Sequence, residues 1–124
     1  MILVDSSVWI DHLRHPDAGL SARLEAGVVL CHPFVIGELA CGHLRRRTHL
    51  LAELALLPEA PIAAHAEALE FLERHALHGL GVGWADTHLL ASTALASRAR
   101  LWTHDKRLAA VAAKLDLNFD PKVH

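Results

Sequence analysis

Four acidic residues, far apart in the chain, each stand beside a segment with a regular apolar pattern: Asp5, Glu38, Asp86 and Asp105. Carboxylates that converge in a fold repel one another and raise each other's pKa values unless a divalent cation lies among them. Their oxygens are hard ligands that suit Mg²⁺ or Mn²⁺, with waters and substrate phosphate completing the shell. The pattern therefore indicates hydrolysis of a phosphodiester by metal-activated water.

Each of these acids also has a purely structural explanation. Asp5, Asp86 and Asp105 stand where a helix is expected to begin, and an acid there satisfies free backbone N–H groups and the helix dipole. Glu38 interrupts an apolar segment, where a carboxylate is costly unless it is paired, binds a metal or faces solvent at a helix edge. The metal-centre interpretation depends on the four acids acting together.

The surrounding sequence alternates short apolar runs with helical patterns. The runs predict strands at 2–4, 28–31 and 101–103, with an edge strand at 118–119. Helical spacing predicts helices at 8–13, 20–26, 33–39, 48–57, 65–78, 85–97 and 105–115, with Thr48 as the cap of the fourth. Strands separated by helices favour crossover connections, so we expect an α/β domain in which helices flank a central parallel sheet. Ligands of such sheets bind beyond the carboxyl ends of the strands, where Asp5 and Asp105 stand.

Composition limits the class of protein. The chain has 124 residues, 52% of them apolar, and a formal net charge of −2, which fits a single domain over 1–124 and disfavours a broadly basic nucleic-acid coat. Two cysteines are too few for a disulfide framework. The first residues lack the pattern of a signal peptide, and no apolar stretch reaches about 18 residues. We therefore expect a cytoplasmic protein without a membrane span.

Four stretches together carry a resemblance to a known family. They are Met1–Asp11, Gly37–Leu39, Asp86–Ala91 and Trp102–Leu108. In order and approximate spacing they resemble the PIN-domain ribonucleases, specifically the VapC toxins of bacterial toxin–antitoxin pairs. The opening and closing stretches together are the most specific part. One departure is His32-Pro33-Phe34 before Glu38, where many relatives have Ser or Thr.

The resemblance implies a PIN-like three-layer fold and an endoribonuclease that depends on Mg²⁺ or Mn²⁺. Asp5 and Asp86 are then the expected metal ligands. Glu38 is a further ligand or places the nucleophilic water. Asp105 completes the acidic cluster, directly or through water.

Three further residues near these acids are expected to support the site. Ser7 and Thr103 carry hydroxyls that can hydrogen-bond a carboxylate or a metal-bound water, and ordinary helix capping is the alternative. His104, beside Asp105, is a candidate for substrate contact. The other histidines, among 11 in the chain, form no compact Cys/His set of the kind that zinc needs and are expected at the surface.

The densest basic stretch is Arg45, Arg46 and Arg47. Its charges are expected to neutralise RNA phosphates outside the acidic centre. The alternative is a solvated junction between two helices. A binding rim needs few phosphate contacts, so the net charge of −2 is no objection.

The resemblance also implies protein partners. A VapB-type antitoxin is expected to wrap the toxin and to place a cationic side chain near the carboxylates. A homodimer and a toxin–antitoxin hetero-oligomer are the expected assemblies. A leucine stripe offers either a partner groove or core packing, namely Leu50, Leu51, Leu54 and Leu57.

Two other functions fit the same residues less well. A non-catalytic RNA- or protein-binding domain on a PIN-like fold predicts an incomplete acidic set, whereas all four candidates are present. A small metal-dependent phosphatase predicts hydrolysis of small phosphate esters with RNA left intact. RNA cleavage that requires Mg²⁺ or Mn²⁺ separates the nuclease from both.

Overall fold

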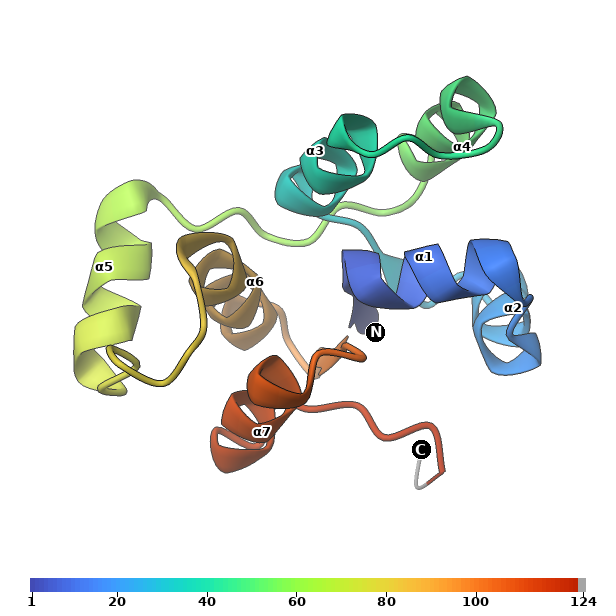
Figure 1. The fold of residues 1–124 in the computed structure, drawn as a ribbon. Helices are drawn as coiled ribbons and strands as arrows, with labels where there is room; N and C mark the ends of the chain where they lie inside the picture. The colour runs from blue at the N-terminus through green and yellow to red at the C-terminus, as the bar shows by residue number, and fades with distance from the viewer. Residues whose placement is uncertain (123–124) are drawn as a thin grey trace.

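The computed structural model of the protein describes residues 1–122 (Figure 1). Within this part of the chain, three short strands lie among seven helices in one α/β fold. The predicted domain extends over 1–124, so its last two residues, Val123 and His124, lie outside the described residues. In residues 1–122, no helix has both the length and the apolar composition needed to cross a membrane.

The sheet consists of β1 (Ile2–Val4), β2 (Val29–Leu30) and β3 (Arg100–Trp102). The strand order is β2-β1-β3, and both pairings are parallel. β1 is central and fully buried, which explains why it is a continuous apolar run rather than an alternating one. The parallel arrangement places the residues after β1 and β3 at the same edge of the sheet.

The helices surround these strands. They are α1 (Ser6–Arg14), α2 (Ala18–Glu25), α3 (Pro33–Cys41), α4 (Arg47–Leu54), α5 (His65–Arg74), α6 (Trp84–Leu95) and α7 (Lys106–Lys114). Figure 1 shows α5, α6 and α7 towards one side of the molecule and α1 to α4 towards the other. The predicted α/β class, with helices flanking a central parallel sheet, is confirmed.

The core surrounds the sheet, with buried apolar residues from α1, α3, α4, α6 and α7. The segment from Thr87 to Thr93 in α6 is buried throughout, as expected of a helix that is covered on all sides. Leu3 of β1 and Leu101 of β3 are almost completely inaccessible to solvent. Because this core holds β3 and α6 against β1, it fixes the positions of the residues that follow the strands.

Several predicted boundaries are wrong for reasons of local conformation. Thr48 does not cap α4, because the helix begins at Arg47 and the left-handed Arg46 (φ 54°) precedes it. α5 ends at Arg74, four residues before the predicted end, and Ala76 adopts φ 50° immediately afterwards. Thr103 lies beyond β3, which ends at Trp102.

Two predicted strand segments reduce to single bridges. Asn118 pairs with Leu101 in an isolated parallel bridge instead of forming an edge strand. Cys31 lies beyond β2 and bridges to Glu59. The leucine stripe belongs mainly to the core, because Leu50 and Leu54 are buried and the other two leucines pack partly buried against them.

Candidate active site

Asp5 is held at the edge of the sheet by the two strands that meet there. It directly follows β1, and its backbone N–H donates to the carbonyl of Trp102 at the end of β3 (2.9 Å). The residue occupies the N-cap position of α1, yet its side chain makes no capping hydrogen bond. Asp5 is 95% buried, and because its carboxylate does not cap the backbone of α1, its oxygens accept from other groups.

Two hydroxyls bind one oxygen of that carboxylate. Ser7 Oγ and Thr103 Oγ1 each lie 2.7 Å from Asp5 Oδ2 and donate to it. The two hydroxyl oxygens are 3.2 Å apart. They do not hydrogen-bond each other, because each hydroxyl has one hydrogen and donates it to Asp5. Their oxygens instead accept the backbone N–H groups of His104 and Asp105, both at 3.0 Å. The network fixes Asp5 and, with it, the loop that carries Asp105.

The second oxygen of Asp5 has a weaker environment. Ser6 Oγ lies 3.5 Å from Asp5 Oδ1 but 2.8 Å from Glu38 Oε2, so its single hydrogen is directed to Glu38. Asp5 Oδ1 therefore keeps its lone pairs for another ligand. Ser6 was not among the predicted site residues, because nothing in its type or position distinguishes it from any first residue of a helix.

Glu38 comes from α3 and faces the same space. Partial burial raises the pKa of its carboxyl, the bond from Ser6 lowers it, and the charges of Asp5 and Asp86 raise it further. The net effect is an elevated pKa. Burial is the larger cause, and the smaller contributions of Asp5 and Asp86 indicate that these carboxylates lie close enough to repel one another.

Asp86 stands in the first turn of α6. Its Oδ2 accepts the backbone N–H of Gly83 at 3.3 Å, a weak capping bond. Partial burial raises the pKa of the Asp86 carboxyl, the bond from Gly83 lowers it, and the charges of Asp5 and Asp105 raise it further. Asp86 thus interacts electrostatically with an acid on either side.

Asp105 is exposed and has the clearest structural role of the four acids. It is the N-cap of α7, and its Oδ1 accepts the backbone N–H of Leu108 at 2.9 Å. Its charge also reaches Asp86. The structure thus brings Asp5, Glu38, Asp86 and Asp105 to one edge of the sheet; we call this group the acidic centre.

The donors of the acidic centre fit a hard divalent cation. They are carboxylate oxygens, two of the carboxyls have raised pKa values because of burial and mutual repulsion, and Asp5 Oδ1 is poorly satisfied. In residues 1–122, no group of three or more His, Cys, Asp or Glu side chains is arranged to hold a metal ion by itself. Mg²⁺ ordinarily uses one or two carboxylates and keeps its waters, so a fully enclosing cage is not required.

The predicted basic rim is not part of this arrangement. Arg45 and Arg46 line a hollow together with Leu13, near the C-terminal end of α1. Asp5 precedes the N-terminal end of α1, roughly 12 Å away at 1.5 Å per residue. Arg47 donates from Nε to the carbonyl of Ala40 at 2.8 Å. Any phosphate contact from this stretch is remote from the acids.

His104 lies next to the acidic centre but is engaged elsewhere. Its backbone N–H belongs to the hydroxyl network, while its imidazole Nδ1 pairs with the carboxylate of Asp11 on α1. Asp11 was not among the predicted site residues, although it belongs to the opening stretch of the sequence. The pair links α1 to the loop after β3.

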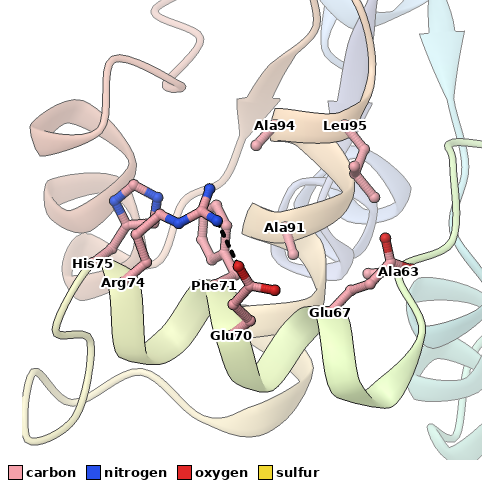
Figure 2. A pocket seen from close by; sticks show the side chains of 9 residues that line it. All are labelled: Ala63, Glu67, Glu70, Phe71, Arg74, His75, Ala91, Ala94 and Leu95. Carbon is pink, nitrogen blue, oxygen red and sulfur yellow. Dashed lines mark hydrogen bonds and ion pairs between the residues drawn. The ribbon is translucent and has the colours of Figure 1, made fainter.

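A pocket between α5 and α6 lies away from the acids. Figure 2 shows Glu70 and Arg74 of α5 joined by an ion pair, 2.6 Å long, across from Ala91 and Leu95 of α6. No member of the acidic centre lines this pocket. The pocket therefore adds no group to the proposed chemistry.

Comparison with known proteins agrees with this geometry. The chain is 49% identical over 114 residues to "Ribonuclease VapC32" of Mycobacterium tuberculosis, in strain CDC 1551 / Oshkosh and in strain ATCC 25618 / H37Rv. Each alignment covers 92% of this chain and 92% of the relative. A family model for the PIN domain matches residues 2–114. The chain belongs to the VapC branch of the PIN-domain family.

The PIN-domain match spans all the residues of the acidic centre, from Asp5 to Asp105. The family predicted from the four sequence stretches is therefore confirmed. The departure at His32 has a structural consequence, because this residue is the N-cap of α3. Its Nδ1 accepts the backbone N–H of Phe34 at 3.0 Å, which is the bond that a Ser or Thr hydroxyl makes at such a position.

Proposed function

We propose that this PIN domain is a metal-dependent endoribonuclease and the toxin of a toxin–antitoxin pair. The observation that carries the proposal is the convergence of four carboxylates from separate elements around Asp5, in a chain 49% identical to ribonucleases. Mg²⁺ or Mn²⁺ is the proposed cofactor because the donors are all carboxylate oxygens. When bound, the cation supplies Lewis-acid chemistry for attack by water on the phosphodiester.

Asp5 and Asp86 are the proposed principal ligands of the cation. The hydroxyls of Ser7 and Thr103 hold Asp5 Oδ2, so that Oδ1 remains directed away from the network. Such outer contacts orient a ligand and set its basicity. Asp105 completes the negative charge of the centre.

Glu38 is the proposed group that orients the attacking water and accepts its proton, or a further ligand. Its raised pKa makes it a better proton acceptor than an ordinary carboxylate. The bond from Ser6 to Oε2 fixes one oxygen and leaves Oε1 for the water. Ser6 is therefore a positioning residue in this scheme.

The proposed partners follow from the family and from the charge of the site. A cationic side chain complements the charge of the acidic centre, so we propose that a VapB-type antitoxin with such a residue inhibits by occupying it. A homodimer and a toxin–antitoxin hetero-oligomer are the proposed assemblies. An RNA substrate places the proposed activity in the cytoplasm.

The test is cleavage mapping on total cellular RNA and on short single-stranded RNAs, with Mg²⁺, with Mn²⁺ and with excess chelator. We expect defined cuts with either ion and none with chelator. Cuts that persist in chelator contradict metal dependence. RNA that is bound but never cut supports the non-catalytic alternative, and hydrolysis of small phosphate esters with RNA intact supports the phosphatase.

A further inference from the structure

A row of aromatic rings lies where α3 and α6 begin. The ring of Phe34 is 4.7 Å from that of His88, and Trp84 is also 4.7 Å from His88. The ring centre of His65 is 5.2 Å from that of Trp84, and the ring centre of His32 is 5.2 Å from that of Phe34. We call these five residues the aromatic ledge.

The aromatic ledge adjoins the acidic centre. Phe34 and Glu38 are four residues apart on α3, so they lie on the same face of the helix, one turn apart. Trp84 and His88, two residues before and after Asp86 on α6, lie on a different face of that helix from Asp86. His88 joins this pair to Phe34 and so to the face of α3 that carries Glu38. Each of the two helices that begin the ledge therefore also carries an acid of the proposed active site.

Two rings of the aromatic ledge, those of Phe34 and Trp84, are open to solvent. Phe34 and Trp84 are each 37% exposed, whereas the other two tryptophans, Trp9 and Trp102, are 4% and 2% exposed. Large exposed aromatic side chains beside a charged site contribute little to the core. They offer flat apolar surface at the place where the proposed substrate must lie.

Two imidazoles of the aromatic ledge are buried, and each has one ring nitrogen without a hydrogen-bond partner. His32 and His88 are at least 95% buried, and neither His32 Nε2 nor His88 Nδ1 has a hydrogen-bond partner. Burial lowers the pKa of His32 to about 4 and also lowers that of His88. Both rings support the exposed rings by contact.

The acidic centre itself does not attract RNA. Without a cation its carboxylates repel the phosphate backbone, and Arg45 and Arg46 lie toward the other end of α1. A contact that is not electrostatic would hold RNA near the cleaved bond even when no cation is bound. Unstacked bases of single-stranded RNA find such a contact on exposed aromatic rings.

We propose that the aromatic ledge is a base-stacking subsite for single-stranded RNA, with Trp84 as its main surface and Phe34 beside it. This inference rests on the proposed ribonuclease function. It assigns to Trp84 and Phe34 the binding of an unpaired base near the cleaved phosphate. Trp84 is a binding residue in this scheme and takes no part in the chemical step.

Tryptophan fluorescence reads the subsite directly. Because Trp9 and Trp102 are buried, stacking of a base quenches Trp84 selectively. With short single-stranded RNA in the presence of chelator, where binding is separated from cleavage, we expect saturable quenching in the wild type. The quenching disappears in Trp84→Phe and is absent when the same RNA is presented as a duplex.

Kinetics supply the second readout. A stacked base contributes enough affinity that Trp84→Ala is expected to raise KM about tenfold, with kcat within about twofold of the wild type. Trp84→Phe keeps a flat ring and recovers most of the loss. Leu95→Ala is the matched control, since Leu95 is an exposed apolar side chain (50%) at the far end of the same helix.

The outcomes separate the subsite from the proposed function. If the KM of Trp84→Ala equals that of the wild type, and RNA does not change the fluorescence of the wild type, the subsite is overturned and the proposed nuclease function stands. If a peptide from the antitoxin quenches Trp84 and RNA does not, the ledge is a binding site for a protein partner instead. Quenching by RNA in a wild type that cleaves no RNA overturns the nuclease and leaves an RNA-binding ledge. Circular dichroism of each variant verifies that the fold is retained.

Discussion

Two groups of like charges occur in this molecule, and they are built in opposite ways. The acidic centre collects its carboxylates from positions as far apart as Asp5 and Asp105, at the ends of separate elements. The basic stretch consists of three consecutive arginines, all exposed, where the chain enters α4. In the first group side chains bind one another through hydroxyls, whereas in the second Arg47 donates to a backbone carbonyl.

The difference distinguishes a site from a surface. Converging carboxylates are unfavourable, and the pKa values of Glu38 and Asp86 are raised first by burial and then further by the charges of the neighbouring acids. The fold maintains the arrangement with a core and a hydroxyl network. Consecutive arginines in solvent require no such support, because water screens their repulsion. The four predictions below test this contrast, beginning with the largest expected effect.

Asp5→Asn is expected to lower kcat/KM for RNA cleavage at least about 100-fold, since a metal ligand supports several kcal/mol of transition-state stabilisation. The amide keeps an oxygen that accepts from Ser7 and Thr103, so the fold is expected to survive. Asp116→Asn is the matched control, because Asp116 is exposed and pairs with Arg100 at the opposite end of β3. Equal activity in the two variants contradicts the assignment of Asp5 as a metal ligand.

Ser6→Ala is expected to shift the acid limb of the cleavage profile to higher pH. The Ser6 hydroxyl lowers the pKa of Glu38, so its removal raises that pKa further and protonates Glu38 at higher pH. The accompanying loss of activity at neutral pH is expected to be about tenfold, typical of an outer-shell contact. A pH–rate profile of both proteins checks this, and coincident acid limbs contradict the role assigned to Ser6.

Asp86→Asn is expected to stabilise the metal-free protein, and more so at high pH. A carboxyl with a raised pKa binds more protons in the folded state than in the unfolded state, so its contribution to stability falls as pH rises through the folded pKa. The difference in melting temperature between variant and wild type should therefore be largest above pH 7 and shrink as pH falls. Taking the difference removes the histidine contributions, His32 included. A difference that does not change with pH contradicts the raised pKa of Asp86.

The smallest effect is expected in the basic stretch. Replacing Arg45 and Arg46 by Gln should leave kcat unchanged and weaken RNA binding no more than about threefold, with a shallower salt dependence. RNA affinity measured at two or more salt concentrations checks this. A loss of kcat as large as that in Asp5→Asn places the arginines in the reacting site and contradicts their description as a solvated surface.

Much of the fold and of the acidic centre was predictable from the sequence, because the informative residues stand at the ends of helices and strands. Asp5 after a buried run and Asp105 before a helical pattern predict one edge of a parallel sheet, and the family follows from the same stretches. The roles of Ser7 and Thr103 were predicted as hydrogen bonding or capping, and the structure places both hydroxyls on Asp5.

Other features depend on contacts that spacing does not encode. Ser6 and Glu38 are 32 residues apart, and only the packing of α1 against α3 brings them together. His32 appears as a departure from the family, yet its ring caps α3 as a hydroxyl would. Helix boundaries at Arg46 and Ala76 are set by left-handed backbone conformations that neither residue type favours.

The central claim is that the acidic centre holds a divalent cation, and a Mn²⁺ titration followed by electron paramagnetic resonance tests it without RNA or catalysis. We predict that the wild type removes Mn²⁺ from the free signal with a saturable stoichiometry. Affinity should fall about 10–100-fold or more in Asp5→Asn and Asp86→Asn, since loss of a ligand exceeds loss of an outer contact. The Arg45→Gln/Arg46→Gln variant should titrate as the wild type does. Identical Mn²⁺ binding in the wild type and both acid variants would contradict the account.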